Sequence, residues 1–174
     1  MGDLPLARTL TPAYSRKPQR AGVRAPSLAL SLVGAQAHDD LPVRRTLRRW
    51  IGAALRRDAE LTLVFVDARA GRRLNREYRG RDYATNVLTF TYGAAGAAVA
   101  PVVADIVLCL PVVRREAHQQ GKTLRAHLAH LVIHGVLHAQ GHDHERERDA
   151  RRMQALETRL LAALRIADPY AAAP

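Results

Sequence analysis

The sequence predicts a single α+β domain in which a small four-stranded mixed sheet packs with about five helices. Short aliphatic runs alternate with longer stretches in which apolar residues recur every three or four positions. A length of 174 residues and an apolar content of 48% suit one domain with its own core. We assign this domain to residues 27–170 and expect residues 1–26, with four prolines, to be a disordered basic extension.

The first half of the domain is predicted to alternate strands and helices. Residues 27–33 and 61–66 read as strands because each is a short, mostly apolar segment. Residues 41–57 and 68–78 read as helices from their apolar spacing. The first helix has Asp39 or Asp40 as its candidate N-cap and an apolar face of Val43, Leu47, Trp50, Ile51 and Leu55.

Two further strands follow in the middle of the chain. Residues 79–86 are polar and contain glycine, which indicates a loop, and residues 87–92 form the next strand. After a Gly/Ala-rich loop over residues 93–100, residues 104–110 are β-branched and, apart from Asp105, apolar. We therefore expect this last strand to lie in the centre of the sheet.

Three helices complete the domain. Pro111 begins the first, and Gly121 ends it. Thr123 is the N-cap of a long helix that Gly141 stops. Residues 145–165 form the last, with an inward face of Met153, Leu156, Leu160, Leu161 and Leu164.

The net charge of +11 comes from the N-terminal extension, which carries +4, and from one block of the fold, which carries +8. Residues 41–81 hold twelve basic and four acidic side chains, whereas the chain after residue 81 is close to neutral. Such asymmetry favours a polyanionic partner, nucleic acid first, although a solvated Arg-rich surface would look the same.

Membrane insertion and disulfide formation are not expected. No apolar run is long enough to cross a bilayer, and the N-terminus lacks a secretory signal. We expect a bacterial cytoplasmic protein, or an organellar one if residues 1–26 are a transit peptide. The single cysteine, Cys109, lies in an apolar stretch and is expected to be buried and inert.

Seven of the eight histidines lie between His118 and His144. His134 and His138 are four residues apart, so they share one helix face at the spacing with which two imidazoles bind one metal ion. Gly141 lets the chain turn back, and His144 is the expected third ligand, with His142 as its competitor. This zincin-like three-histidine arrangement leaves a position open for water, as catalytic zinc sites do.

Other interpretations of the histidines stay open. The face could bind nothing, or the metal could be structural. For His127 and His130 we expect packing or support of the ligands rather than ligation. Zinc proteases with the HExxH motif carry a glutamate after the first histidine, and here that position is Gly135, so the peptidase mechanism lacks its general base.

Several motifs in the same order resemble one family. HGVLHAQGHDH, over residues 134–144, resembles the YbeY signature HGxLHLxGYDH, with His142 in place of the usual tyrosine. LNREYRGRDYATNVLTF over residues 74–90, ADIVLC over residues 104–109 and the terminal MQALETRLLAAL followed by DPY also resemble YbeY segments. The resemblance extends over about residues 41–170.

This resemblance implies a metal-dependent endoribonuclease specific for single-stranded RNA, with no DNA substrate expected. It implies one Zn²⁺ per chain on His134, His138 and His144, and catalytic roles for Arg79 and His134. The implied role is maturation of the 16S rRNA 3′ end and ribosome quality control, with the small ribosomal subunit and its assembly factors as partners. Phosphate attraction is expected from Arg72, Arg73, Arg76 and Arg81.

Two other functions compete with this interpretation. The first is a metalloprotease, which Gly135 disfavours. The second is a non-catalytic ribosome-assembly factor with a structural metal, which the basic block fits as well as a nuclease does.

Overall fold

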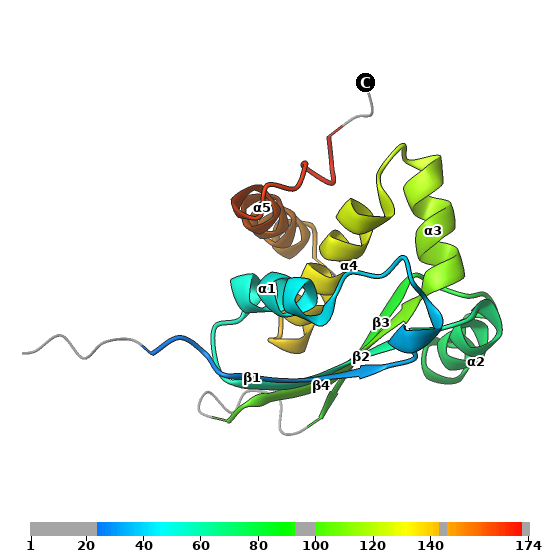
Figure 1. The fold of residues 1–174 in the computed structure, drawn as a ribbon, viewed down its shortest axis with the longest axis horizontal. Coiled ribbons are helices and arrows are strands. Elements are labelled where there is room, and N and C mark those ends of the chain that lie inside the picture. The colour runs from blue at the N-terminus through cyan, green and yellow to red at the C-terminus, as the bar shows by residue number, and fades with distance from the viewer. Residues whose placement is uncertain (1–23, 93–99, 143–145, 172–174) are drawn as a thin grey trace, which may run out of the picture.

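The computed structural model describes residues 24–92, 100–142 and 146–171 and confirms one α+β domain (Figure 1). The strands are β1 (Leu28–Val33), β2 (Ala59–Val66), β3 (Val87–Tyr92) and β4 (Val102–Cys109). The helices are η1 (Ala35–Ala37), α1 (Arg44–Ala54), α2 (Ala68–Arg79), α3 (Leu110–Gln119), α4 (Leu124–Ala139) and α5 (Glu147–Ala163).

The sheet is mixed, as predicted, with the strand order β1-β2-β4-β3. β1, β2 and β4 are parallel, and β3 runs antiparallel to β4. β4 is hydrogen-bonded on both sides and buried along much of its length, which confirms it as an inner strand. β3 therefore forms one edge of the sheet, next to the strand that leads into α3.

Helix α4 occupies the centre of the helical layer (Figure 1). It packs against β3 and β4 on one side and contacts α1, α3 and α5 on others. A helix surrounded in this way must be apolar on most of its circumference, and ten of its sixteen residues are buried. His130, His134 and His138 lie on the stripe that remains, so the packing of α4 determines which way they face.

The start of α1 differs from the prediction. The helix begins at Arg44, its N-cap residue is Val43, and no side chain caps it. Val43 is 68% exposed, so its predicted place on the inward face is wrong. Asp40 instead accepts two hydrogen bonds from the Arg114 guanidinium of α3, at 2.7 and 2.9 Å, which lower the pKa of its carboxyl and hold it away from the helix end.

The first described residue forms an ion pair with the domain. Residues 1–23 of the predicted extension lie outside the described residues, and the Arg24 guanidinium contacts the Asp58 carboxylate at 2.9 Å.

Cys109 is buried as predicted, and burial raises the pKa of its thiol. Within the described ranges, no helix has the length and apolar character that a membrane span requires.

Candidate metal centre

Helix α4 brings the predicted metal-binding histidines together. Thr123 Oγ1 accepts a hydrogen bond from the Ala126 amide at 3.1 Å, which confirms the predicted N-cap. Further along, the ring centroids of His134 and His138 lie 4.6 Å apart. Two imidazoles one helical turn apart at this separation suit a single metal ion. His144, the predicted third ligand, lies outside the described residues.

His134 and His138 face a cavity of about 300 Å³ between α4, β3 and the end of α2. Its lining is mostly polar and consists of Arg79, Thr85, Asn86, Val87, Thr89, Thr91, His134 and His138. The fold thus places the predicted catalytic arginine and two predicted metal ligands around one cavity, although they lie far apart in the sequence. Such a convergence of polar groups is typical of an active site.

The composition of residues 79–86 predicted a loop, but Arg79 does not lie in it. It is the last residue of α2, and Gly80 follows with φ 65°, the left-handed conformation that glycine adopts readily after a helix. The next segment is held by Asn75, whose Nδ2 donates to the Tyr83 carbonyl at 2.8 Å. Asn86 then donates to Glu116 at 2.9 Å. Arg79 therefore extends from a fixed helix end beside an anchored segment.

A buried carboxylate that the sequence analysis missed supports the histidines. Glu157 of α5 is 0% exposed, and its Oε1 lies 2.7 Å from His134 Nδ1. Its Oε2 lies 3.3 Å from His130 Nε2 and accepts a hydrogen bond from the Tyr170 hydroxyl. Burial by itself raises the pKa of Glu157, but these hydrogen bonds outweigh it and lower the pKa to about 2. The carboxylate is therefore ionised at neutral pH.

Two metal positions are compatible with these side chains. His130, His134 and Glu157 each offer a ligand atom within 4.8 Å of the others, so this group could hold a metal ion. In the other arrangement Glu157 accepts the Nδ1 proton of His134, and Nε2 faces a metal shared with His138. A carboxylate in that position is the usual partner of a metal-binding histidine. Both arrangements use His134, and neutral imidazole donors suit zinc in either.

His127 is buried away from the cavity that His134 and His138 line, whereas His118 and His142 are exposed. His127 is 3% exposed, and its Nε2 lies 2.9 Å from Glu116 Oε2. Burial lowers its pKa more than Glu116 raises it. Since Glu116 also binds Asn86, His127 supports the wall of the cavity, in line with the packing role predicted for it.

The contacts of Gly135 explain why no glutamate follows His134. A Cβ atom at this position would lie 2.7 Å from Ile106 Cγ2 and 3.2 Å from Thr89 Oγ1. The helix is therefore pressed against β3 and β4, with no room for a side chain. The glutamate of an HExxH peptidase could not be accommodated here without separating α4 from the sheet.

The arginines predicted to attract RNA lie on and just after α2. Arg72 makes a two-point hydrogen bond with Asp82, at 2.8 and 2.6 Å, and Arg76 lies 4.0 Å from the same carboxylate. Arg73 and Arg81 are exposed. The four side chains thus flank Arg79 in the sequence, three before it and one after it, with Asp82 partly offsetting two of them.

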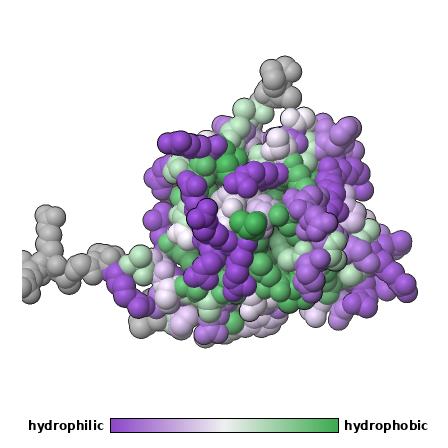
Figure 2. Space-filling view, in the orientation of Figure 1, coloured by the Kyte–Doolittle hydropathy of each residue, from purple (hydrophilic) through white to green (hydrophobic). Residues whose placement is uncertain are grey.

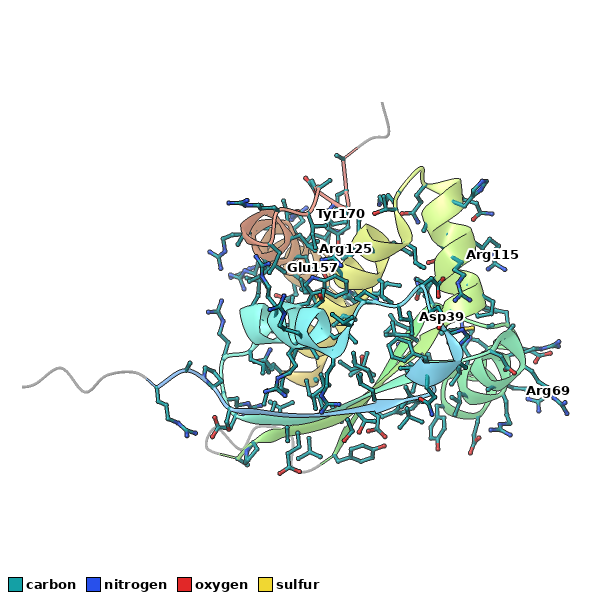
Figure 3. All side chains as sticks on the ribbon, in the orientation of Figure 1. Asp39, Arg69, Arg115, Arg125, Glu157 and Tyr170 are labelled. Atoms are coloured by element: carbon teal, nitrogen blue, oxygen red, sulfur yellow. The ribbon has the colours of Figure 1, made fainter. Side chains whose placement is uncertain are left out.

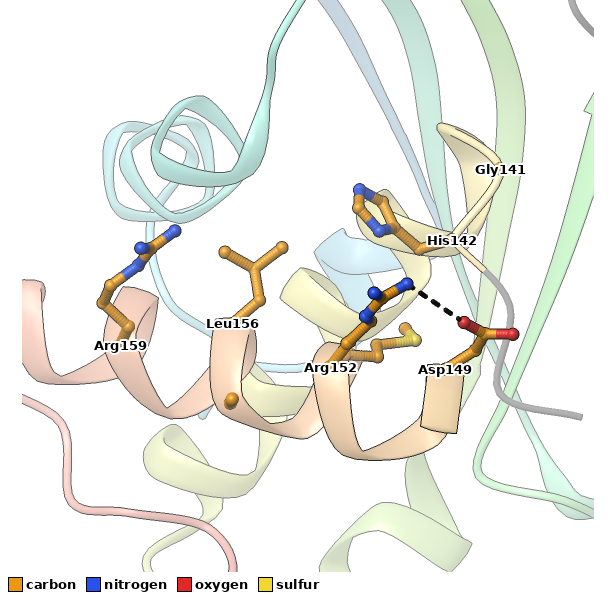
Figure 4. Close-up of a pocket in the computed structure, with 8 residues that line it drawn as sticks. Gly141, His142, Asp149, Arg152, Leu156 and Arg159 are labelled. Carbon is orange, nitrogen blue, oxygen red and sulfur yellow. Dashed lines mark ion pairs between the residues drawn. The ribbon is translucent and has the colours of Figure 1, made fainter. Parts of the chain in front are cut away.

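A larger open groove, of about 840 Å³, lies along α5 (Figure 4). Its lining consists of Gly141, His142, Asp149, Arg152, Met153, Ala155, Leu156 and Arg159. Arg152 and Asp149, one turn apart on α5, form an ion pair at 3.7 Å. Of the predicted site residues that the structure describes, only His142, the alternative third ligand, lines this groove, so size alone does not identify the site.

Comparison with known proteins decides the family. The family model described as Endoribonuclease YbeY matches residues 36–165. The chain belongs to the YbeY family. The YbeY match includes Arg79, His134, His138 and Glu157, and so covers the cavity and its supporting carboxylate.

Curated YbeY relatives match over most of their length. The endoribonuclease YbeY of Paraburkholderia phymatum is 54% identical, with 84% of this chain and 98% of that protein covered. The endoribonuclease YbeY of Cupriavidus necator is 51% identical, with coverages of 97% and 84%. A solution structure of a Thermotoga maritima protein, 22% identical, covers 83% of this chain and 99% of its own, with a TM-score of 0.48.

Proposed function

We propose that this YbeY protein is a metal-dependent endoribonuclease that cleaves single-stranded RNA. The observation that carries the proposal is the cavity in which Arg79 of α2 meets His134 and His138 of α4. YbeY relatives named as endoribonucleases, matched over most of their length, support RNA as the substrate. The proposal includes one Zn²⁺ per chain, with His144 completing the ligands.

The residues around the cavity suit phosphodiester cleavage. Negative charge grows on the nonbridging and leaving oxygens as the bond breaks, and fixed positive groups stabilise it. The guanidinium of Arg79 can bind two phosphate oxygens at once. His134 and His138 would hold the Zn²⁺, with Glu157 orienting His134. When bound, the ion would act as a Lewis acid.

The biological setting in this proposal is the bacterial cytoplasm. The substrate is rRNA, the reaction is maturation of the 16S 3′ end, and the partners are the small ribosomal subunit and its assembly factors. A further role in ribosome quality control belongs to the same proposal. The basic surplus in residues 41–81 supports a polyanionic partner, and the family supports RNA rather than DNA.

An assay on two substrates tests this function. We expect the purified protein to cleave a fluorogenic single-stranded RNA and to leave labelled casein intact. A chelator should abolish RNA cleavage, and added Zn²⁺ should restore it. Casein cleavage would support the peptidase alternative, and a zinc-loaded protein that leaves RNA intact would support the non-catalytic assembly factor.

The arginines near Arg79 should contribute to RNA binding through direct phosphate contacts. We expect Arg76→Gln with Arg81→Gln to reduce the salt dependence of single-stranded RNA binding by a slope of about 1.4, because each phosphate contact contributes about 0.7. The measurement is fluorescence anisotropy of a labelled RNA at several salt concentrations.

A matched control comes from α1, where hydrophilic side chains gather on the face shown in Figure 2. Arg45 and Arg49 are exposed and make no hydrogen bond or ion pair with the described part of the chain. Replacing both by Gln removes the same charge away from the cavity, and the slope should change much less. Equal slopes for the two double variants would show that RNA binds the basic surface without preference for the Arg79 region.

A further inference from the structure

The chain after α5 turns back toward α4 and brings Tyr170 beside His130. Arg165 has φ 60°, and the Ile166 amide donates to the Leu161 carbonyl at 2.9 Å, which turns the chain out of the helix. Asp168 then accepts hydrogen bonds from Thr158 Oγ1 and from the Tyr170 amide, both at 3.0 Å. Lys122 donates to the Pro169 carbonyl. These contacts fix the segment that carries Tyr170.

Tyr170 contacts the buried carboxylate of α5 and the histidine stripe of α4 (Figure 3). Its hydroxyl bonds to Glu157 Oε2 and lies 3.2 Å from His130 Nε2. Its ring meets the His130 ring edge-on, with centroids 5.4 Å apart. Around these groups is a small cavity of about 190 Å³, lined by His134, Ala150, Met153, Gln154, Glu157 and Tyr170.

The two carboxylate oxygens of Glu157 have different partners. Oε1 meets His134 Nδ1, while Oε2 meets Tyr170 and His130. The hydrogen bonds to Oε2 fix the rotation of the carboxylate. That rotation determines the direction of the hydrogen bond between Oε1 and His134 Nδ1. An imidazole bonded through Nδ1 in this way keeps its proton there and directs Nε2 outward.

We propose that Glu157 is a positioning residue for the metal centre and that Tyr170 holds Glu157 in place. The C-terminal segment, Asp168–Tyr170, thereby becomes a structural part of the site, although it lies outside the cavity that contains Arg79. This inference rests on the proposed metal function, and it assigns Glu157 to the support of His134 rather than to metal ligation.

Zn²⁺ affinity tests this inference without any RNA assay. Competition with a chromophoric chelator should show an affinity loss of about 10- to 100-fold for Glu157→Gln. Tyr170→Phe keeps the ring on His130 and removes only the hydroxyl, so we expect a smaller loss, of about 3- to 10-fold. Tyr83→Phe is the control, because the Tyr83 side chain is exposed and lies outside this network.

Two further readouts separate positioning from ligation and from a general structural role. In the metal-free protein, ¹⁵N spectra should show His134 protonated at Nδ1, and Glu157→Gln should mix the tautomers. If the variants lower only the melting temperature of the metal-free protein and keep Zn²⁺ affinity, positioning is wrong. If Glu157→Gln and His130→Ala both abolish binding, Glu157 is a ligand. A wild-type protein that binds no Zn²⁺ would instead contradict the proposed function.

Discussion

Replacing Arg79 with alanine should reduce RNA cleavage by about 10²- to 10³-fold while leaving the fold and Zn²⁺ content unchanged. The side chain is at the exposed end of α2 and lines the cavity that His134 and His138 also line. Among the residues that the structure describes, it makes no hydrogen bond or ion pair whose loss would destabilise the domain. The measurement is kcat/KM on a short fluorogenic RNA, with circular dichroism and metal analysis of the same samples.

Comparison variants determine whether the effect belongs to the guanidinium of Arg79. Arg79→Lys should recover only part of the rate, because an ammonium group cannot make the two-point contact of a guanidinium. Arg76→Ala, one turn earlier on the same helix, should weaken RNA binding slightly and leave kcat nearly unchanged. If Arg76→Ala and Arg79→Ala lower kcat equally, Arg79 belongs to the basic surface and has no catalytic role.

The sequence predicted most of the fold because its signals were local. Thr123 before α4 and Gly121 after α3 each occupy a position that a particular backbone conformation requires, and the short β-branched runs favour strands. The error at Arg79 has a local cause as well. The glycine that follows a helix marks the position just beyond its end, so Gly80 could have indicated that Arg79 is helical.

The Glu157 network depends on packing that the sequence does not show. Four residues after Met153 and four before Leu161, Glu157 lies on the apolar face of α5, and a charge there is a signal that a buried partner exists. The sequence gives no indication of which partner. The contacts come from α4 and from a C-terminal segment that a turn at Arg165 directs back.

Two alanine variants determine whether His138 or His130 binds the metal ion together with His134. We expect His138→Ala to lose its Zn²⁺, and with it the stabilisation that a bound ion gives the folded state. We expect His130→Ala to retain the ion with reduced affinity. His130 contacts Glu157 and Tyr170 and does not line the cavity that contains Arg79. Metal content by mass spectrometry and the melting temperature with and without chelator measure both effects.

The opposite pattern would relocate the ion. Full zinc content in His138→Ala, together with loss in His130→Ala, would assign the metal to His130, His134 and Glu157. Arg79 would then face His134 across a cavity that does not contain the ion. The geometry favours His138, because its ring is 4.6 Å from that of His134 while the His130 ring is 6.2 Å away. His138 also shares with Arg79 the cavity in which we propose that the phosphate binds.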